Sequence, residues 1–314
     1  LIYWAKKNVD GFRCDVAEMV PVEFWSWVIP QVKKVNPKII FIGEAYDPKK
    51  FSNYLNVGKF DFLYDKVGLY DALKRLIKDE PNASVKDITH VWKEESRGFS
   101  SRMLRFLENH DEERVASEGF AKDPKYAKPA MVVTATLGSG PVMIYFGQEV
   151  GEPGKGKEGF GGEDNRTTIF DYWGVPHHQQ WMNNGKFDGA ALSNDEKELR
   201  KFYSKLLNVT ATNNAIRMGH FYELMDQPGL SNKNYAYLRY TLHHKVLVVA
   251  NFDRNKSIET KIKLSAELIK TLKLKGTQTY TFNNLLKGES FKVNNLDDGI
   301  EIKVPPSDAI ILSF

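Results

Sequence analysis

Apolar residues in the first two thirds of the chain alternate between short continuous runs and longer stretches with a helical period. Residues 38–43 and 141–146 are continuous apolar runs, which are typical of strands buried on both faces. Residues 22–35 place their apolar side chains on one stripe and end at Asn36-Pro37, which predicts an amphipathic helix. The alternation of the two patterns predicts strands that are each followed by a helix or loop.

The predicted strands and helices form repeated units. Strands are expected at residues 9–14, 38–43, 60–63, 102–107 and 141–146, and helices at 22–35, 70–77, 84–94, 125–138 and 195–208. Such units predict a parallel sheet of the α/β class, either doubly wound or closed as a barrel. Five strands are fewer than the eight of a complete (β/α)8 barrel, which typically needs about 250 residues.

The pattern of apolar residues changes near Ala215. From there on, short apolar runs recur between turn signals. Strands are expected at residues 217–224, 235–240, 246–252, 257–264, 277–283, 289–293, 299–304 and 309–314. Regular short strands predict an antiparallel sandwich. Within them, residues 261–275 alternate lysines with apolar residues like the solvated faces of strands. We therefore predict two domains, a partial barrel at residues 1–212 and a β-sandwich at 213–314.

Composition narrows the functional classes. The chain has 314 residues, 42% hydrophobic and 27% charged, which is ordinary for a soluble globular protein. Its net charge of +4 is too small to indicate nucleic acid or an acidic membrane as a partner, and no run is long enough to span a membrane. Cys14 is the single cysteine, so no internal disulfide can form and no cysteine-based metal site is expected.

The start of the chain indicates a longer protein. Residues 1–8 have no initiator Met and resemble the middle of a helix. We therefore expect this sequence to be the later part of a larger polypeptide. No signal peptide is visible, and localisation and export stay open.

The stretch Gly11-Phe12-Arg13-Cys14-Asp15 ends the first predicted strand and carries the first candidate chemistry. Arg13 and Asp15 lie on the same face, because strand side chains alternate with period two. A guanidinium beside a carboxylate favours its ionised form, which a nucleophile needs. The alternative is a structural ion pair at a strand end.

Two further acids follow later strands. Glu44 stands just past the strand at 38–43, where partial desolvation favours the protonated form that a general acid needs. Asp111 follows His110 after the strand at 102–107. The alternatives are a helix-capping role for Glu44 and a capping cluster at residues 109–111. Catalytic groups gather at the C-terminal ends of parallel strands, and paired carboxyls indicate glycoside hydrolysis, with a third stabilising the transition state.

At this point the sequence resembles the α-amylase family, glycoside hydrolase family 13. The resemblance covers nearly the whole chain and is carried by Gly11–Asp15, by Phe41-Ile42-Gly43-Glu44-Ala45, by Phe106-Leu107-Glu108-Asn109-His110-Asp111 and by Tyr145–Gly151. These segments resemble the family's motifs of barrel strands four, five and seven and the segment after strand eight, in the family's order.

The resemblance implies a role for each matching residue. Asp15 is expected to be the nucleophile that forms a glycosyl-enzyme, Glu44 the acid/base, and Asp111 the group that stabilises the transition state. Arg13 is expected to orient Asp15, and His110 to contact the same sugar. The resemblance also implies substrate contacts from Asn109 and Tyr46. The implied substrate is an α-glucan or malto-oligosaccharide cleaved at α-1,4 bonds.

The sequence also departs from the family. Barrel strands one to three and their Asp…Asn-His motif are absent, and Glu18-Met19 stand where many α-amylases carry Lys-His. We therefore assign no metal site and no cofactor to this chain; calcium is expected only through the absent N-terminal part. We expect the chain alone to be weakly active or inactive, with the other barrel half or a second copy as candidate partners. Transglycosylation, α-1,6 or trehalose-type cleavage, and a non-catalytic glucan-binding relative remain alternatives.

Aromatic residues, a glycine-rich segment and two histidine pairs are weaker candidates for functional roles. Besides Tyr46, aromatic side chains that could stack on sugars are Phe160, Tyr172 and Trp173. The glycine-rich residues 159–166 lack the spacing of a phosphate cradle and fit a mobile loop on the substrate side. Loop anchoring is the alternative for each aromatic residue. The pairs His177-His178 and His243-His244 are not expected to bind metal, because neighbouring residues do not face one site.

Overall fold

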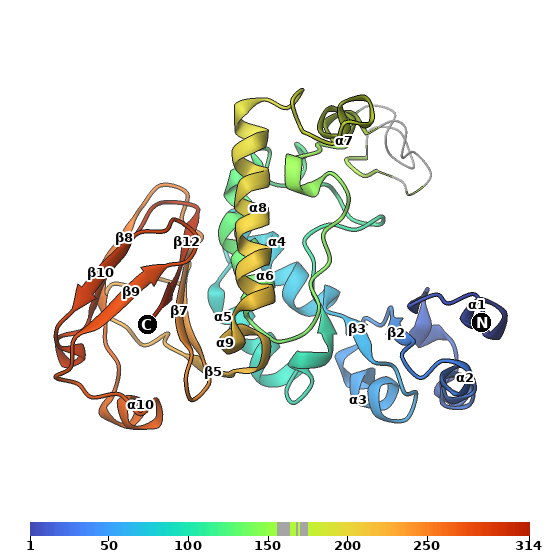
Figure 1. Cartoon of the computed structure of the whole chain (residues 1–314), viewed down its shortest axis with the longest axis horizontal. Helices are drawn as coiled ribbons and strands as arrows, with labels where there is room; N and C mark the ends of the chain where they lie inside the picture. Colours follow the sequence, from blue (N-terminus) through green and yellow to red (C-terminus); the bar gives the residue numbers. More distant parts are fainter. Residues whose placement is uncertain (156–163, 168, 170–174) are drawn as a thin grey trace. The chain divides into compact units, whose positions relative to one another are not determined.

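The computed structural model describes residues 1–155, 164–167, 169 and 175–314 (Figure 1). The chain divides into two compact units. The first unit comprises Leu1–Ala72, Lys86–Phe106 and Ser139–Met143, and the second comprises Leu73–Val85, Leu107–Gly138 and Ile144–Phe314. The predicted domain boundary between residues 212 and 213 lies inside the second unit and stays a prediction.

The first unit contains a parallel sheet whose strands follow one another in chain order. They are β1 (Gly11–Cys14), β2 (Ile40–Gly43), β3 (Phe62–Tyr64) and β4 (Met103–Leu104). Every neighbouring pair is parallel, as predicted. In the β1–β2 ladder Cys14 lies opposite Gly43. The residues that follow these two strands therefore leave the sheet at the same edge.

The fifth predicted strand is mostly absent. Residues 141–146 form one parallel bridge, between Val142 and Arg105, and they are only half-buried. The expectation of a strand buried on both faces was wrong here. Pro141 has no N–H to donate to a ladder. It accepts a hydrogen bond from the N–H of Arg105, and Met143 donates to the carbonyl of Arg105.

Helices pack on the sheet of the first unit. They are α1 (Ile2–Ala5), α2 (Val22–Val35) and α3 (Pro48–Asn56), and α2 has the bounds that its apolar stripe predicted. Trp25 of α2 packs edge-on against Phe60, with ring centroids 4.9 Å apart. Asp61 accepts hydrogen bonds from Lys33 of α2 at 2.6 Å and from the N–H of Phe41 at 2.7 Å. The carboxylate of Asp61 therefore fixes α2 to the centre of the sheet.

The other predicted helices are present: α4 (Asp71–Ile77), α5 (Val85–His90), α6 (Lys128–Thr136) and α8 (Asn194–Thr212). The helices α7 (Pro176–Met182), α9 (Asn214–Met218) and α10 (Ala266–Thr271) were not predicted. Turns of π-helix at Lys66–Tyr70 and Val91–Glu95 adjoin α4 and α5, and a 3-10 turn at Pro124–Ala127 precedes α6. Helices α6 and α8 lie side by side (Figure 1).

The C-terminal part of the second unit is an antiparallel β domain. Its strands are β5 (His220–Glu223), β6 (Asn234–Tyr240), β7 (Lys245–Asn251), β8 (Ile258–Ile262), β9 (Tyr280–Asn284), β10 (Ser290–Val293), β11 (Ile300–Val304) and β12 (Asp308–Ser313). Six form one sheet in the order β10-β9-β12-β7-β6-β5, and β11 pairs with β8 in a second. One core contains residues of both sheets, such as Leu247 and Ile302, which confirms the predicted antiparallel architecture.

One prediction about this domain was wrong. Residues 261–275 do not continue as strand, because Ala266–Thr271 forms α10. Ser265 caps this helix by accepting a hydrogen bond from the N–H of Leu268 at 3.1 Å. Leu268, Ile269 and Leu272 are buried. Their spacing is helical, so the pattern has a period of 3.6 rather than the period of two that the alternating lysines suggested.

No helix in the described part of the chain is long and apolar enough to cross a membrane.

Candidate active site

One arginine contacts two of the three predicted catalytic acids. Asp15 follows β1 and Glu44 follows β2, so both stand at the C-terminal edge of the parallel sheet. Nη1 of Arg13 forms an ion pair with Oδ1 of Asp15. Nη2 of the same guanidinium lies 2.9 Å from Oε1 of Glu44. The side chain of Asp15 is 73% exposed and that of Glu44 is 7% exposed, so one acid faces solvent and the other is enclosed.

The guanidinium of Arg13 is itself held by the third strand. Its Nε donates to the hydroxyl of Tyr64 at 3.2 Å, and its Cζ lies 5.4 Å from the centre of the Tyr64 ring. Burial works against the charge, but the hydrogen bonds to Tyr64 and Asp15 raise the pKa of Arg13 above its ordinary value. The site therefore contains a permanent positive charge between its two acids.

Glu44 accepts two further hydrogen bonds. The N–H of Val16 donates to Oε2 at 2.7 Å, and the hydroxyl of Tyr46 donates to Oε1 at 2.6 Å. Val16 has φ 45° and ψ 40°, a left-handed conformation that a β-branched residue rarely adopts. Backbone strain of this kind is typical of functional sites. Sequence reasoning missed Val16, because its side chain carries no chemistry and only its backbone contributes.

Asp111 belongs to the second unit, whereas Asp15 and Glu44 belong to the first. Oδ2 of Asp111 lies 3.0 Å from Nε2 of His110, and its side chain is 46% exposed. Asn109 is 2% exposed, and its Oδ1 accepts hydrogen bonds from the N–H groups of Asp111 at 2.9 Å and Glu112 at 2.8 Å. In this conformation Asn109 holds the turn that carries Asp111. Its expected contact with a sugar stays a prediction.

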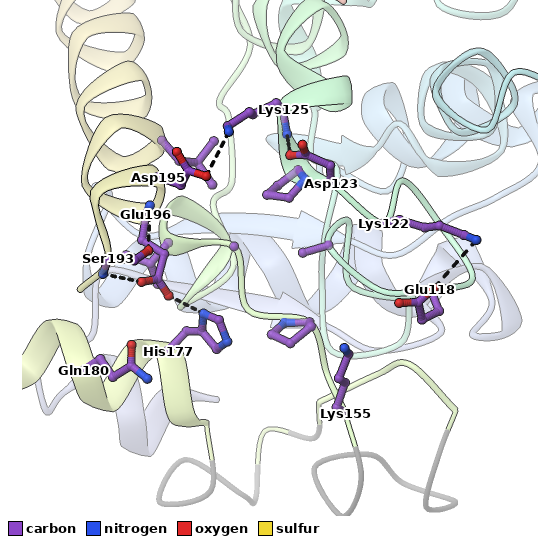
Figure 2. A pocket seen from close by; sticks show the side chains of 16 residues that line it. Glu118, Lys122, Asp123, Lys125, Lys155, His177, Gln180, Ser193, Asp195 and Glu196 are labelled. Atoms are coloured by element: carbon purple, nitrogen blue, oxygen red, sulfur yellow. Dashed lines mark hydrogen bonds and ion pairs between the residues drawn. The ribbon is translucent and has the colours of Figure 1, made fainter. Parts of the chain in front are cut away.

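The second unit also contains a cavity of about 560 Å³ that none of the predicted site residues lines. Figure 2 shows its wall, formed by the loop after residue 115, by His177 of α7 and by the N-terminal turn of α8. Two side chains of this wall contact the acidic residues Asp195 and Glu196 of α8. Lys125 lies 3.1 Å from Asp195, and Nδ1 of His177 contacts Oε1 of Glu196. The wall of the cavity thus contains contacts between its own polar side chains.

A model of the family described as "Alpha amylase, catalytic domain" matches residues 1–263 of the chain. The chain belongs to the α-amylase family. The family match covers the parallel sheet with its strand-end acids and extends into the β domain. The fold and the family inferred from the strand-end motifs are confirmed.

Curated members of the α-amylase family are similar to the chain at low identity. Alpha-amylase 3 of Dictyoglomus thermophilum is 24% identical over 273 residues, which cover 80% of this chain and 52% of that protein. A cyclomaltodextrinase of a Bacillus species is 25% identical over 257 residues, covering 80% of this chain and 40% of that protein. The chain therefore spans about half the length, or less, of these relatives.

Solved structures show the same fold. The α-amylase from Geobacillus thermoleovorans, in a crystal structure with acarbose, superposes with a TM-score of 0.72 at 20% identity. The superposition covers all of this chain and 62% of that one. The partial barrel and the β domain after it are therefore an arrangement that α-amylase structures share.

Apart from Tyr46, the predicted aromatic contacts with sugars involve residues outside the described part of the chain. The aromatic candidates Phe160, Tyr172 and Trp173 lie outside the described residues, as does most of the glycine-rich loop. Within the described residues, no three His, Cys, Asp or Glu side chains converge in a way that could hold a metal ion.

Proposed function

We propose that the chain carries the retaining chemistry of an α-glucan hydrolase that acts on α-1,4 bonds of starch or malto-oligosaccharides. The observation that supports this most is the shared guanidinium: Arg13 contacts both Asp15 and Glu44. In a retaining glycosidase two carboxyl groups stand close together, one as nucleophile and one as acid/base. The acarbose complex of the Geobacillus α-amylase supports an α-glucan as the substrate class.

The proposed first step uses the two acids in different roles. The exposed carboxylate of Asp15 attacks the anomeric carbon, and the bond to the leaving sugar breaks. Glu44 gives its proton to the leaving oxygen, which leaves a glycosyl ester on Asp15. In the second step Glu44 takes a proton from water, and the water oxygen displaces Asp15. Asp111 stabilises the oxocarbenium-like transition state in both steps.

Glu44 must change its hydrogen bonds when its carboxyl group is protonated. In this conformation the carboxylate contacts Arg13 and accepts hydrogen bonds from Val16 and Tyr46. The hydroxyl of Tyr46 can rotate so that it accepts a hydrogen bond instead of donating one. A protonated Glu44 can then donate to Tyr46 until substrate takes its place. We therefore propose that the hydroxyl of Tyr46 accepts a hydrogen bond from the protonated carboxyl group of Glu44 before the proton is transferred.

The proposal includes the expectation that the chain by itself turns over soluble starch weakly or not at all. The described parallel sheet has four strands and one further bridge, whereas a closed barrel of this kind has eight strands. Kinetic tests therefore use the shortest polypeptide that contains residues 1–314 and hydrolyses soluble starch, called below the active polypeptide.

The deciding experiment separates the roles of the two acids. In the active polypeptide, Glu44→Gln should lower turnover of starch by a factor of roughly 10²–10⁴, because general acid–base catalysis contributes that much. The same variant should still be glycosylated by α-maltosyl fluoride, whose leaving group needs no acid, and azide should restore its turnover. Asp15→Asn should show neither reaction. Equal behaviour of the two variants would contradict the assigned roles.

The linkage is a separate question, because the same acids can serve several reactions. The similar cyclomaltodextrinase illustrates a different activity within the matched proteins. Products from maltoheptaose, pullulan and trehalose distinguish α-1,4 hydrolysis from transglycosylation and from α-1,6 or trehalose-type cleavage. A protein that binds these glucans without any turnover would instead be a non-catalytic relative.

A further inference from the structure

The turn that carries His110 and Asp111 is closed at its base by a buried carboxylate. Glu108 is 1% exposed. Its Oε1 accepts a hydrogen bond from the N–H of Val115 at 2.7 Å, and its Oε2 lies 2.7 Å from Nη1 of Arg114. The two ends of the segment are therefore joined through one side chain. Residues 109–113 form a loop whose base is fixed.

The guanidinium of Arg114 extends this closure to two other segments. Arg114 is fully buried, and its Nε donates to Oγ1 of Thr167 at 2.8 Å. Its Nη2 donates to the carbonyl of Phe146 at 2.8 Å, and its own N–H donates to the carbonyl of Asn165 at 2.8 Å. The Cζ atom also lies 4.3 Å from the centre of the Tyr145 ring. The planar guanidinium thus joins the turn to the segment that contains Phe146 and to residues 165–167.

Asp111 is held through its backbone while its carboxylate is left accessible. Asn109 accepts the N–H of Asp111, and Nη1 of Arg166 lies 3.4 Å from the carbonyl of Asp111. The carboxylate itself is 46% exposed. A buried frame below an exposed functional group is the arrangement that holds such a group in one geometry.

A buried ion pair is weak evidence for stability, because desolvation offsets the attraction between its charges. The chain offers a matched comparison in Arg105 and Asp65, which are both 2% exposed and lie 3.0 Å apart. Oδ1 of Asp65 accepts the N–H of Leu69 at 3.0 Å, as Oε1 of Glu108 accepts that of Val115. Asp65 caps the π-helical turn at Lys66–Tyr70, which carries none of the predicted site residues.

We propose that Arg114 is a positioning residue for Asp111 and His110, acting through its fork of hydrogen bonds rather than through its charge alone. Glu108 orients the guanidinium, and Thr167 couples the turn to residues 165–167. This inference rests on the proposed function, in which Asp111 stabilises the transition state. It adds that the geometry of Asp111 depends on a side chain that does not touch the substrate.

Amide hydrogen exchange in the full chain tests the inference directly. Arg114→Lys keeps the charge but cannot make the same three side-chain contacts. The N–H groups of Asp111 and Glu112 should then exchange at least about tenfold faster than in the parent chain. Arg105→Lys is the matched control and should leave these two amides unchanged, even where its global stability falls equally. Parent-like exchange in Arg114→Lys, or equal acceleration in the control, overturns the proposal.

A milder variant keeps the test valid if Arg114→Lys does not fold. Thr167→Val preserves volume and removes only the acceptor of Nε. It should accelerate exchange at Asp111 and Glu112 by about threefold or more, and unchanged exchange there counts against the coupling.

Kinetics of α-maltosyl fluoride in the active polypeptide separate the inference from the proposed function. Arg114→Lys should lower kcat by tenfold or more with little change in KM, whereas Arg105→Lys should change neither. If Asp111→Asn retains full turnover, the proposed function fails while the exchange result still stands. If Asp111→Asn is inactive and Arg114→Lys turns over normally, the inference alone fails.

Discussion

Nη2 of Arg13 lies 2.9 Å from Oε1 of Glu44, so the residue expected to orient the nucleophile also contacts the acid/base. The contact joins β1 to the residue after β2, across strands that pair in parallel. A single guanidinium can bridge two carboxylates because its nitrogens diverge in one plane. The relation between Arg13 and Glu44 was not part of the sequence prediction, which paired Arg13 with Asp15 alone.

The first prediction follows from this shared contact. In the active polypeptide, Arg13→Lys should lower kcat/KM by about a hundredfold or more, because one ammonium cannot reach Asp15, Glu44 and Tyr64 together. The measurement is hydrolysis of malto-oligosaccharides. Lys33→Arg serves as a control, since Lys33 pairs with Asp61, which precedes β3 rather than following a strand as the two acids do. Parent-like kinetics in Arg13→Lys would show that positive charge alone suffices.

The second prediction concerns the strained backbone at Val16. A left-handed conformation costs an ordinary residue roughly 1–2 kcal/mol, and glycine avoids that cost while losing roughly 0.5–1 kcal/mol of chain entropy. Val16→Gly should therefore be neutral or should stabilise the chain by up to about 1 kcal/mol in denaturant unfolding. Val57 is similarly exposed but has φ −86°, so Val57→Gly should destabilise. Destabilisation by both variants to the same extent would argue against strain at Val16.

The third prediction uses the single cysteine as a probe of folding. Cys14 is 8% exposed, and burial raises the pKa of its thiol to about 11. At pH 8 the reactive thiolate is then only about one part in a thousand. Labelling by a disulfide reagent should be slow in the native chain and fast in denaturant. Rapid native labelling would show that the end of β1 opens readily.

Most of the predictions about the parallel sheet and the site came from the strand-end motifs. Particular residues show what these motifs could predict and what they could not. The strands at residues 9–14 and 38–43 were expected in one parallel sheet, because strands that alternate with helices form such sheets, and β1 and β2 do pair in parallel. The expectation placed Asp15 and Glu44 at one edge correctly. It could not find Val16 or Tyr64, since the first contributes a backbone N–H and the second lies two strands away from β1.

The wrong predictions share a cause: each depended on contacts or spacing that the composition of a short segment does not report. Residues 141–146 have the composition of a buried strand, yet their burial depends on neighbours on both sides, which composition does not report. Helix α10 was missed because alternating lysines masked the helical spacing of Leu268, Ile269 and Leu272. The role of Asn109 in its turn was also not visible, because a motif names a residue without saying which of its atoms are already bonded.

The last prediction concerns the N-terminus of α8, where Ser193 and Glu196 form a reciprocal capping box. Oε2 of Glu196 accepts the N–H of Ser193 at 2.6 Å, and the hydroxyl of Ser193 accepts the N–H of Glu196 at 3.3 Å. Ser193→Ala should cost about 1 kcal/mol in the free energy of unfolding. Ser204→Ala, an exposed change inside the same helix, should stay within about 0.5 kcal/mol of the parent.

The capping box also makes stability depend on pH. Burial opposes the charge of Glu196, but the hydrogen bonds from Ser193 and the contact with His177 lower the pKa of its carboxyl group. A carboxyl whose pKa is lower in the folded chain stabilises the fold above its unfolded pKa, and this contribution is lost as the pH falls through the folded value.

The stability difference between the parent and Glu196→Gln should therefore be full near pH 6 and should shrink below the ordinary pKa of 4.5. Urea unfolding at a series of pH values measures it, with Glu198→Gln as the exposed control on the same helix. A difference that stays constant down to pH 3 would mean that Glu196 acts through packing rather than through its charge.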